Sequence, residues 1–151
     1  MPVEVAGLVM EERVDVVSSE DVKMGVDTRR KVHASGAWHH GVHILVFDSR
    51  GRLLLQRRSA KKKTSPLAID LSVSEHAKEG ESFEEAAVRG LREELGIGAI
   101  PLTRVLKFRM NYGPGDNMIS VLFRGRFDGE VELDPAEVKE VIAVGLSLIH
   151  I

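Results

Sequence analysis

A group of glutamates near the middle of the chain has the residue types and spacing for metal chemistry. Glu81 lies just before a segment of helical periodicity, and Glu93 and Glu94 lie near its end. Residues three and four apart share a helix face, so positions 90, 93 and 94 fall within a fan of roughly 100° that Arg89 borders. Hard cations such as Mg²⁺ require oxygen ligands. A cation held here would neutralise a diphosphate while water attacks phosphorus; the simpler interpretation is a solvated helix face.

The segment that carries these glutamates has the start and stop signals of a helix. Ser82 can cap its first turn, and Glu85 sits three residues later as the partner in a capping box. Gly96 is suited to the C-terminal end. Apolar residues recur at helical spacing and predict a stripe that faces the core, namely Phe83, Ala86, Ala87, Leu91 and Leu95.

The other apolar runs predict strands, because they are short and are bounded by turn residues. We expect a hairpin at 14–26, a second hairpin of residues 42–47 and 53–56, and further strands at 68–73, 104–110 and 118–127. Residues 135–137 are expected to open one helical turn. Strands outnumber helices in a mixed order, which predicts an α/β (α+β) fold with a mixed sheet sandwiched between helices. The apolar tail at 141–151 is expected to be buried in the core or against a second subunit, as in a homodimer.

Length and composition restrict the class of protein. A chain of 151 residues predicts a single domain spanning 1–151, and its net charge of −2 gives no electrostatic case for a nucleic-acid polymer as partner. The absence of cysteine excludes disulfides, thiolate metal sites and cysteine-based catalysis. The first residues lack the features of a signal peptide, and no apolar run approaches the ~20 residues that span a bilayer. We therefore expect a cytoplasmic protein without a membrane partner.

The helix and the loop before it resemble the Nudix box, whose pattern is G-x5-E-x7-R-E-U-x-E-E-x-G-U, with U an aliphatic residue. The matching positions are Glu81, Arg89, Leu91, Glu93, Glu94, Gly96 and Ile97. The resemblance implies a Nudix fold and a Mg²⁺ or Mn²⁺ ion on Glu93 and Glu94. It also implies structural or orienting roles for Arg89 and Glu81. We predict a hydrolase that cleaves a nucleoside diphosphate-X or another small-molecule diphosphate.

Two positions depart from this pattern. Glu75 stands where the family uses a glycine whose backbone carbonyl contacts metal, and Gly90 stands where the family has the first Glu of R-E-U-x-E-E. A glycine inside a helix costs about 1 kcal/mol relative to alanine, so local stability does not explain Gly90. One hypothesis is that Glu75 supplies the lost carboxylate and is a metal ligand. The other is a weakened or repurposed site, such as a silent module that binds a nucleotide or diphosphate.

The histidines narrow the resemblance to one branch of the superfamily. Neutral imidazole is a common ligand of Zn²⁺ and Mn²⁺, although histidines near a strand are more often structural or surface groups. The arrangement of five histidines, together with residues 51–59 and 70–76, resembles that of the isopentenyl-diphosphate isomerase-like branch. The five are His33, His39, His40, His43 and His76. In that branch's isomerases, histidines that match His33, His39 (or His40) and His76 help to bind a divalent metal.

The same resemblance bears on substrate and reaction. The branch places basic residues near its diphosphate, and the matching residues here are Arg57, Arg58, Lys61, Lys62 and Lys63. The alternative for them is an ordinary solvated basic loop. Ser74 stands where the isomerase has its catalytic Cys, and Asp116-Asn117-Met118 lacks the second carboxylate of the isomerase's Glu-x-Glu. The double-bond shift needs one proton added and another removed, and this chain lacks recognisable groups for both steps. We therefore predict hydrolysis and keep isomerase activity as the alternative.

Overall fold

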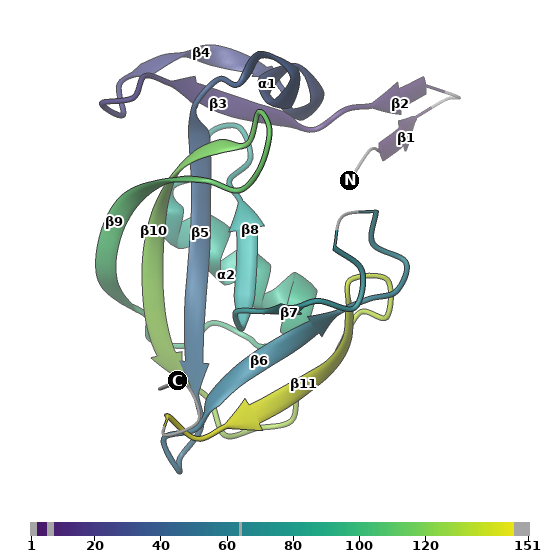
Figure 1. Ribbon diagram of the computed structural model, residues 1–151, viewed down its shortest axis with the longest axis vertical. Helices are drawn as coiled ribbons and strands as arrows, with labels where there is room; N and C mark the ends of the chain where they lie inside the picture. Colours follow the sequence, from purple (N-terminus) through teal and green to yellow (C-terminus); the bar gives the residue numbers. More distant parts are fainter. Residues whose placement is uncertain (1–2, 6–7, 64, 147–151) are drawn as a thin grey trace.

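The computed structural model of the protein describes residues 3–5, 8–63 and 65–146, with its elements labelled in Figure 1. Strands β1 (Val3–Val5) and β2 (Leu8–Met10) pair with each other near the N-terminus. Strands β3 (Arg13–Val17) and β4 (Lys23–Thr28) form the antiparallel hairpin predicted at 14–26, and helix α1 (Arg29–Ser35) follows. Figure 1 shows β3, β4 and α1 together at one end of the main sheet.

The main sheet has mixed strand directions. Its order is β11-β6-β5-β10-β9, while β7 pairs with β6 and β8 pairs with β5. The β5–β10 pair is parallel and the other pairs are antiparallel, which confirms the predicted α/β class with a mixed sheet. The strands are β5 (His39–Phe47), β6 (Leu53–Arg58), β7 (Ile69–Asp70), β8 (Val73–His76), β9 (Thr103–Asn111), β10 (Asn117–Arg126) and β11 (Val138–Val144).

Helix α2 (Phe83–Leu95) has the boundaries that its capping residues predict. The Ser82 hydroxyl accepts from the Glu85 N–H at 3.1 Å, and the Glu85 carboxylate accepts from the Ser82 N–H at 3.2 Å. Gly96 ends the helix with a φ of 63°, in the left-handed region that favours glycine. The whole predicted stripe is buried in the core: Phe83, Ala86, Ala87, Leu91 and Leu95. Among the described residues, no helix combines the length and apolarity needed to cross a membrane.

Several local expectations differ from the structure. The strand predicted at 68–73 is divided into β7 and β8, with residues 71 and 72 between them. Residues 135–137 form a turn rather than a helix, closed by the N–H groups of Glu137 and Val138, which donate to the Asp134 carbonyl. Helix α1 was not predicted; Thr28 caps it and Gly36 ends it. Part of the tail at 141–151 forms β11, and residues 147–151 lie outside the described residues.

The break between β7 and β8 divides one edge of β5 between two partners. Residues 41–44 of β5 pair with β8, whereas Val46 and Phe47 pair with β6. At the break, the Ser72 hydroxyl accepts from the Val46 N–H at 2.9 Å and donates to the Leu54 carbonyl. Strands β6 and β8 therefore share one edge of β5, and helix α2 contacts β8 and β5.

The pairing of β5 with β8 decides which residues face α2. Val42 lies opposite Glu75, and His43 lies opposite Ser74. Directly paired residues project from the same face of a sheet, and Val42 belongs to the core that contains the buried side of α2. Glu75 therefore projects toward α2, whereas Ser74 and His43 project from the opposite face.

Candidate functional site

Glu94 is a deeply buried carboxylate, with 7% of its surface exposed. The Gln56 side-chain amide donates to Glu94 Oε1 at 2.8 Å and to the Ser72 carbonyl at 3.0 Å, so Gln56 of β6 orients the carboxylate. Glu94 Oε2 is also buried but has no hydrogen-bond partner among the described residues. Burial raises the pKa of Glu94 well above its usual value, and the negative charge of Glu75 adds to the increase. A buried acceptor without a donor is costly, and a cation would satisfy it.

Glu75 faces the middle of α2, where Gly90 has no side chain. A Cβ atom on residue 90 would lie 2.9 Å from Val73 Cγ1 and 3.4 Å from Glu75 Cβ. Burial alone would raise the pKa of Glu75, but a hydrogen bond from His76 and the charges of His76 and Arg89 outweigh it and lower the pKa. Glu75 is therefore ionised beside a glycine that leaves room for it.

Gly90→Ala tests this packing, because helix propensity and close packing predict changes of opposite sign in the free energy of unfolding. Helix propensity alone predicts that alanine stabilises the protein by about 1 kcal/mol. We instead expect a net loss of about 1–2 kcal/mol in the free energy of unfolding, because the added methyl group collides with Val73. Urea unfolding measures the difference. In a Val73→Ala background the same substitution should become neutral or stabilising, and a stabilising effect in the wild type would contradict the observed packing.

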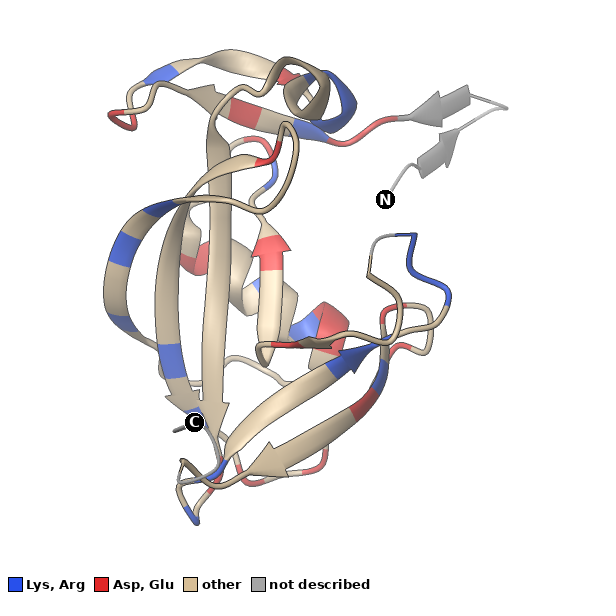
Figure 2. Cartoon of the chain, in the orientation of Figure 1, with Lys and Arg blue, Asp and Glu red and all other residues tan. Residues whose placement is uncertain are grey.

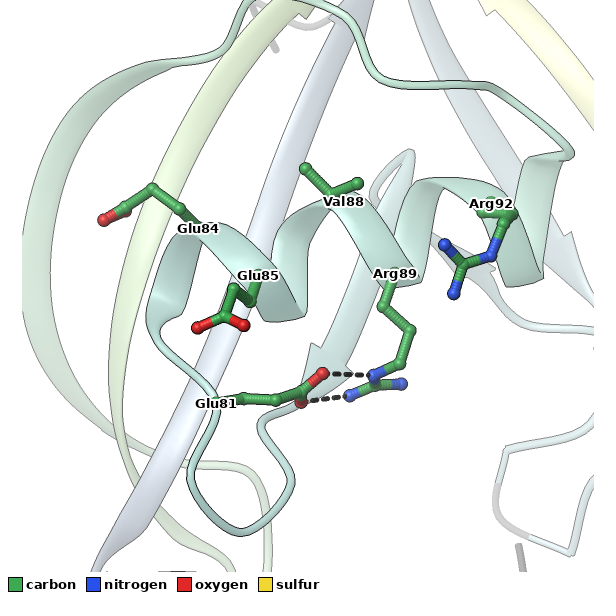
Figure 3. A pocket seen from close by; sticks show the side chains of 6 residues that line it. All are labelled: Glu81, Glu84, Glu85, Val88, Arg89 and Arg92. Carbon is green, nitrogen blue, oxygen red and sulfur yellow. Dashed lines mark hydrogen bonds and ion pairs between the residues drawn. The ribbon is translucent and has the colours of Figure 1, made fainter.

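Arg89 links the acidic residues of the predicted site. Its guanidinium group forms two bonds to Glu81, from Nε to Oε2 at 2.8 Å and from Nη2 to Oε1 at 3.0 Å, as Figure 3 shows. Nη2 also donates to the His76 carbonyl at 2.8 Å, while Nη1 lies 3.2 Å from Glu93 and 3.6 Å from Glu75. Burial lowers the pKa of Arg89, but these carboxylates outweigh it and raise the pKa. Arg89 therefore fixes the loop before α2 against the helix.

A shallow pocket opens beside the Arg89–Glu81 pair, on the outer side of α2 (Figure 3). Its lining is mostly charged and includes neither Glu75 nor Glu94: Glu81, Glu84, Glu85, Val88, Arg89 and Arg92. Glu93 is half-exposed, with 45% of its side-chain surface accessible. The predicted acidic residues thus range from the buried Glu94 through the partly buried Glu75 and Glu81 to the half-exposed Glu93. Arg89 contacts the last three of these.

His76 connects the loop before α2 to the N-terminal part of the chain. Its Nε2 lies 2.7 Å from Glu12 and its Nδ1 lies 2.9 Å from Glu75. Burial lowers the pKa of His76, but the hydrogen bonds with Glu12 and Glu75 outweigh it and raise the pKa. The hydrogen bond with His76 is the main cause that lowers the pKa of Glu12. His76 is therefore part of an ion-pair network with Glu12 and Glu75.

The Glu12–His76 pair predicts a pH-dependent contribution to stability. Because folding raises the pKa of His76, its contribution to the free energy of unfolding is complete below pH 6.5, the ordinary pKa. This contribution is lost as the pH rises through the folded-state pKa. The lowered pKa of Glu12 makes its contribution present above 4.5 and lost on acidification. We expect Glu12→Gln to cost about 2 kcal/mol near pH 5.5 and clearly less near pH 9. Unfolding at the two pH values tests this; an equal cost at both would contradict it.

A second group of potential ligands lies at the end of the sheet near α1. The Nε2 atoms of His33 and His39 lie 3.5 Å and 3.3 Å from Asp116 Oδ1. In the part of the chain that the structure describes, these three residues have ligand atoms within 4.8 Å of one another, as a metal ion requires. His39 is fully buried, and neither its Nε2 nor Asp116 Oδ1 has a hydrogen-bond partner in the described part of the chain. This histidine cluster fits a divalent metal such as Mn²⁺ or Zn²⁺.

The structure distinguishes between the adjacent His39 and His40. His39 lies in the histidine cluster, whereas His40 lies 2.5 Å from Asp21 and packs on Phe83. Asp116 was not predicted as a ligand. Residues 116–118 were compared only with the isomerase's Glu-x-Glu, whose second carboxylate they lack. The parallel pairing of β5 with β10, which places Met118 opposite His39, brings the two segments together.

The predicted basic residues are held by acidic partners close to Glu94. Arg58 lies 3.6 Å from Asp70, Lys62 lies 2.5 Å from Glu137, and Arg57 lies 3.3 Å from Glu140. Figure 2 shows these basic residues at the end of β6 and in the loop that follows. Asp70 and Glu137 also contribute to the raised pKa of Glu94. Two of the acidic partners therefore lie within electrostatic range of the buried carboxylate, and the charges of the basic residues are partly compensated.

A third polar group occupies the opposite face of the sheet. The Ser74 hydroxyl donates to Asp70 at 3.2 Å and lies 3.1 Å from His43 Nδ1, which is 3.0 Å from the Tyr112 hydroxyl. Burial lowers the pKa of His43, so the ring is neutral near pH 7. Ser74 lies between His43 and Asp70, so the order of the three groups is not that of a nucleophilic triad, in which the base stands in the middle. Sequence reasoning missed this network, because Tyr112 is far from His43 in the chain.

Comparison with known proteins is consistent with this geometry. A family model described as NUDIX domain matches residues 37–149. An isopentenyl-diphosphate Delta-isomerase of Aromatoleum aromaticum is 35% identical over 135 residues, which cover 87% of this chain and 71% of the relative. An uncharacterized Nudix hydrolase of Streptomyces coelicolor is 33% identical over 129 residues, which cover 85% of this chain and 71% of the relative. A crystal structure of a Deinococcus radiodurans protein superposes with a TM-score of 0.78 at 24% identity, covering 91% and 86% of the two chains, which supports the fold alone.

Proposed function

Because this chain belongs to the Nudix family, we propose that it hydrolyses a small-molecule diphosphate, of the nucleoside diphosphate-X type or a related one, with a divalent metal ion. The observation that carries the proposal is Glu94 Oε2, which is buried without a hydrogen-bond partner in the described structure. A carboxylate donor of this kind fits Mg²⁺ or Mn²⁺. When bound, the ion would neutralise charge on the diphosphate.

The residues of the chain would divide the remaining tasks. Glu94 and Glu93 would hold the ion, and Gln56 fixes the orientation of the Glu94 carboxylate. Arg89 and Glu81 hold the loop before α2 in position through their two hydrogen bonds. Arg58, with Arg57 and Lys62, would bind the phosphate oxygens by exchanging their present acidic partners for the substrate, which stabilises negative charge as the bond to phosphorus breaks.

A substrate panel tests the proposal. The purified protein would be incubated with nucleoside diphosphate sugars, dinucleoside polyphosphates, nucleoside diphosphates and isopentenyl diphosphate, each with Mg²⁺, Mn²⁺ or EDTA. We expect phosphate-containing products from at least one class, only when a divalent ion is present. Glu79→Gln, which changes an exposed acidic residue paired with Arg13, serves as a control that should retain the activity.

The histidine cluster supports a second candidate, an isopentenyl-diphosphate isomerase relative. His33, His39 and Asp116 offer ligands to one ion, and a relative of which the match covers 71% is named for that activity. Ser74 stands in the position of the isomerase's catalytic Cys, as the sequence resemblance implies, which weakens this candidate. Formation of dimethylallyl diphosphate from isopentenyl diphosphate would support it. Ligand-induced thermal stabilisation without any turnover would instead indicate a binding module.

A further inference from the structure

We infer that Glu75 supplies a metal-binding carboxylate from strand β8, in the space that Gly90 leaves open on helix α2. This carboxylate replaces one that the helix would otherwise provide. The inference rests on the proposed function, which places a divalent ion at Glu94. It adds a ligand from a different secondary-structure element and gives a reason for the glycine within the helix.

The packing of β8 on α2 explains the glycine. Gly90 lies inside the helix, where glycine costs about 1 kcal/mol relative to alanine, and its φ is not in the left-handed region. Its benefit is close approach, because a Cβ there would lie 2.9 Å from Val73 Cγ1 and 3.4 Å and 3.8 Å from Glu75 Cβ and Cγ. The stem of the Glu75 side chain thus occupies the place where a longer side chain on residue 90 would begin.

The helix geometry then places the Glu75 carboxylate beside Glu94. Residues 90 and 94 are four apart and lie on the same face of α2. A side chain that covers Gly90 from the strand is therefore a neighbour of Glu94, and the negative charge of Glu75 acts on Glu94 through the intervening space. One carboxylate from β8 and one from α2 would then be offered to the same hard cation, which prefers oxygen ligands.

The individual oxygen atoms of the two carboxylates also fit a cation site. Glu94 Oε2 is buried and unpartnered within the described residues. Glu75 Oε1 is fixed by the His76 N–H at 3.0 Å and by His76 Nδ1 at 2.9 Å. Within the described part of the chain, Glu75 Oε2 has a long ion pair, at 3.6 Å from Arg89 Nη1. One oxygen of Glu75 is thus anchored, and the other is loosely held and available to an ion shared with Glu94.

The competing explanation is that Glu75 only balances the charges of Arg89 and His76. Mg²⁺ binding, measured by calorimetry without substrate, tests whether Glu75 acts on the metal, and moving the carboxylate to the helix then separates a ligand from a charge-balancing residue. Mg²⁺ is chosen because it prefers oxygen ligands, so the histidine cluster contributes little. Loss of an outer-shell partner commonly weakens metal binding 10- to 100-fold, so loss of a ligand in Glu75→Gln should weaken it by at least about tenfold. The control Glu79→Gln should bind as the wild type does.

The exchange itself is tested by moving the carboxylate back to the helix. Glu75→Gly combined with Gly90→Glu removes the strand side chain, so that of the three nearest atoms to a Cβ at residue 90 the Val73 methyl group remains. This double variant should bind Mg²⁺ to within about tenfold of the wild type. Wild-type affinity in Glu75→Gln would overturn the inference, and so would a folded double variant that binds no better than Glu75→Gln. If these binding results hold but no diphosphate is hydrolysed, the proposed function fails while the Glu75 ligand stands.

Discussion

Glu94→Gln is expected to lower kcat/KM for a diphosphate substrate by at least about a hundredfold, because the reaction loses a preorganised electrostatic contact. Glutamine keeps the shape of the side chain and can still accept from Gln56, whose amide lies 2.8 Å from Glu94 Oε1. Unlike the acid, it cannot lose a proton and bind a cation through Oε2, the atom that lies buried without a partner in the described structure. The loss should therefore appear in metal binding as well as in turnover.

The same substitution should leave the metal-free protein nearly as stable as the wild type. The raised pKa of Glu94 means that the charged form is already disfavoured by burial and by Glu75, and a neutral amide resembles the protonated acid. We expect the free energy of unfolding without metal to change by less than about 1 kcal/mol. Thermal unfolding with and without Mg²⁺ measures both states. A large stability loss without metal, or an unchanged Mg²⁺-induced increase in Tm, would contradict the assigned role.

Arg89→Met is expected to have the largest effect on stability, a loss of about 3–5 kcal/mol in the free energy of unfolding. Methionine can fill much of the volume of the arginine stem, but it leaves Glu81 and Glu75 without their shared cation. It also removes the donor to the His76 carbonyl, 2.8 Å away. The loop before α2 would then lose the interactions that fix it to the helix.

Urea unfolding of Arg89→Met and of Arg92→Met measures this effect under matched conditions. Arg92 lies on the same helix but is exposed in its last turn, where a basic residue contributes about 0.3–1 kcal/mol. Arg89→Lys should recover only part of the loss, because an ammonium group cannot form the paired bonds to Glu81. Equal effects of the Arg89 and Arg92 substitutions would mean that the buried network does not stabilise the loop.

Local patterns predicted most of the elements. Ser82, Glu85 and Gly96 define the ends of α2 through contacts within a few residues, and such signals are visible in one sequence. Helix α1 was missed, because its Thr28 cap and Gly36 terminus enclose a short segment without a clear apolar stripe. The break between β7 and β8 was also missed. It depends on Ser72, whose hydroxyl bonds to the distant Val46 and Leu54.

The candidate site shows the same division between local and distant information. The departures at positions 75 and 90 are visible in the sequence, but their contact depends on the packing of β8 against α2. Gln56 carries no signal of its own, yet it orients Glu94 from a neighbouring strand. Asp116 joins His33 and His39 only because the turn before β10 lies beside α1 and the start of β5.

The central claim is tested most directly by isotope incorporation. The wild-type protein would be incubated with the diphosphate panel in ¹⁸O-labelled water, with Mg²⁺ or with EDTA, and the products analysed by mass spectrometry. Metal-dependent hydrolysis predicts ¹⁸O in a phosphate group of at least one product with Mg²⁺ and none with EDTA. Absence of label from every product of the folded protein, or equal labelling with EDTA, would contradict it.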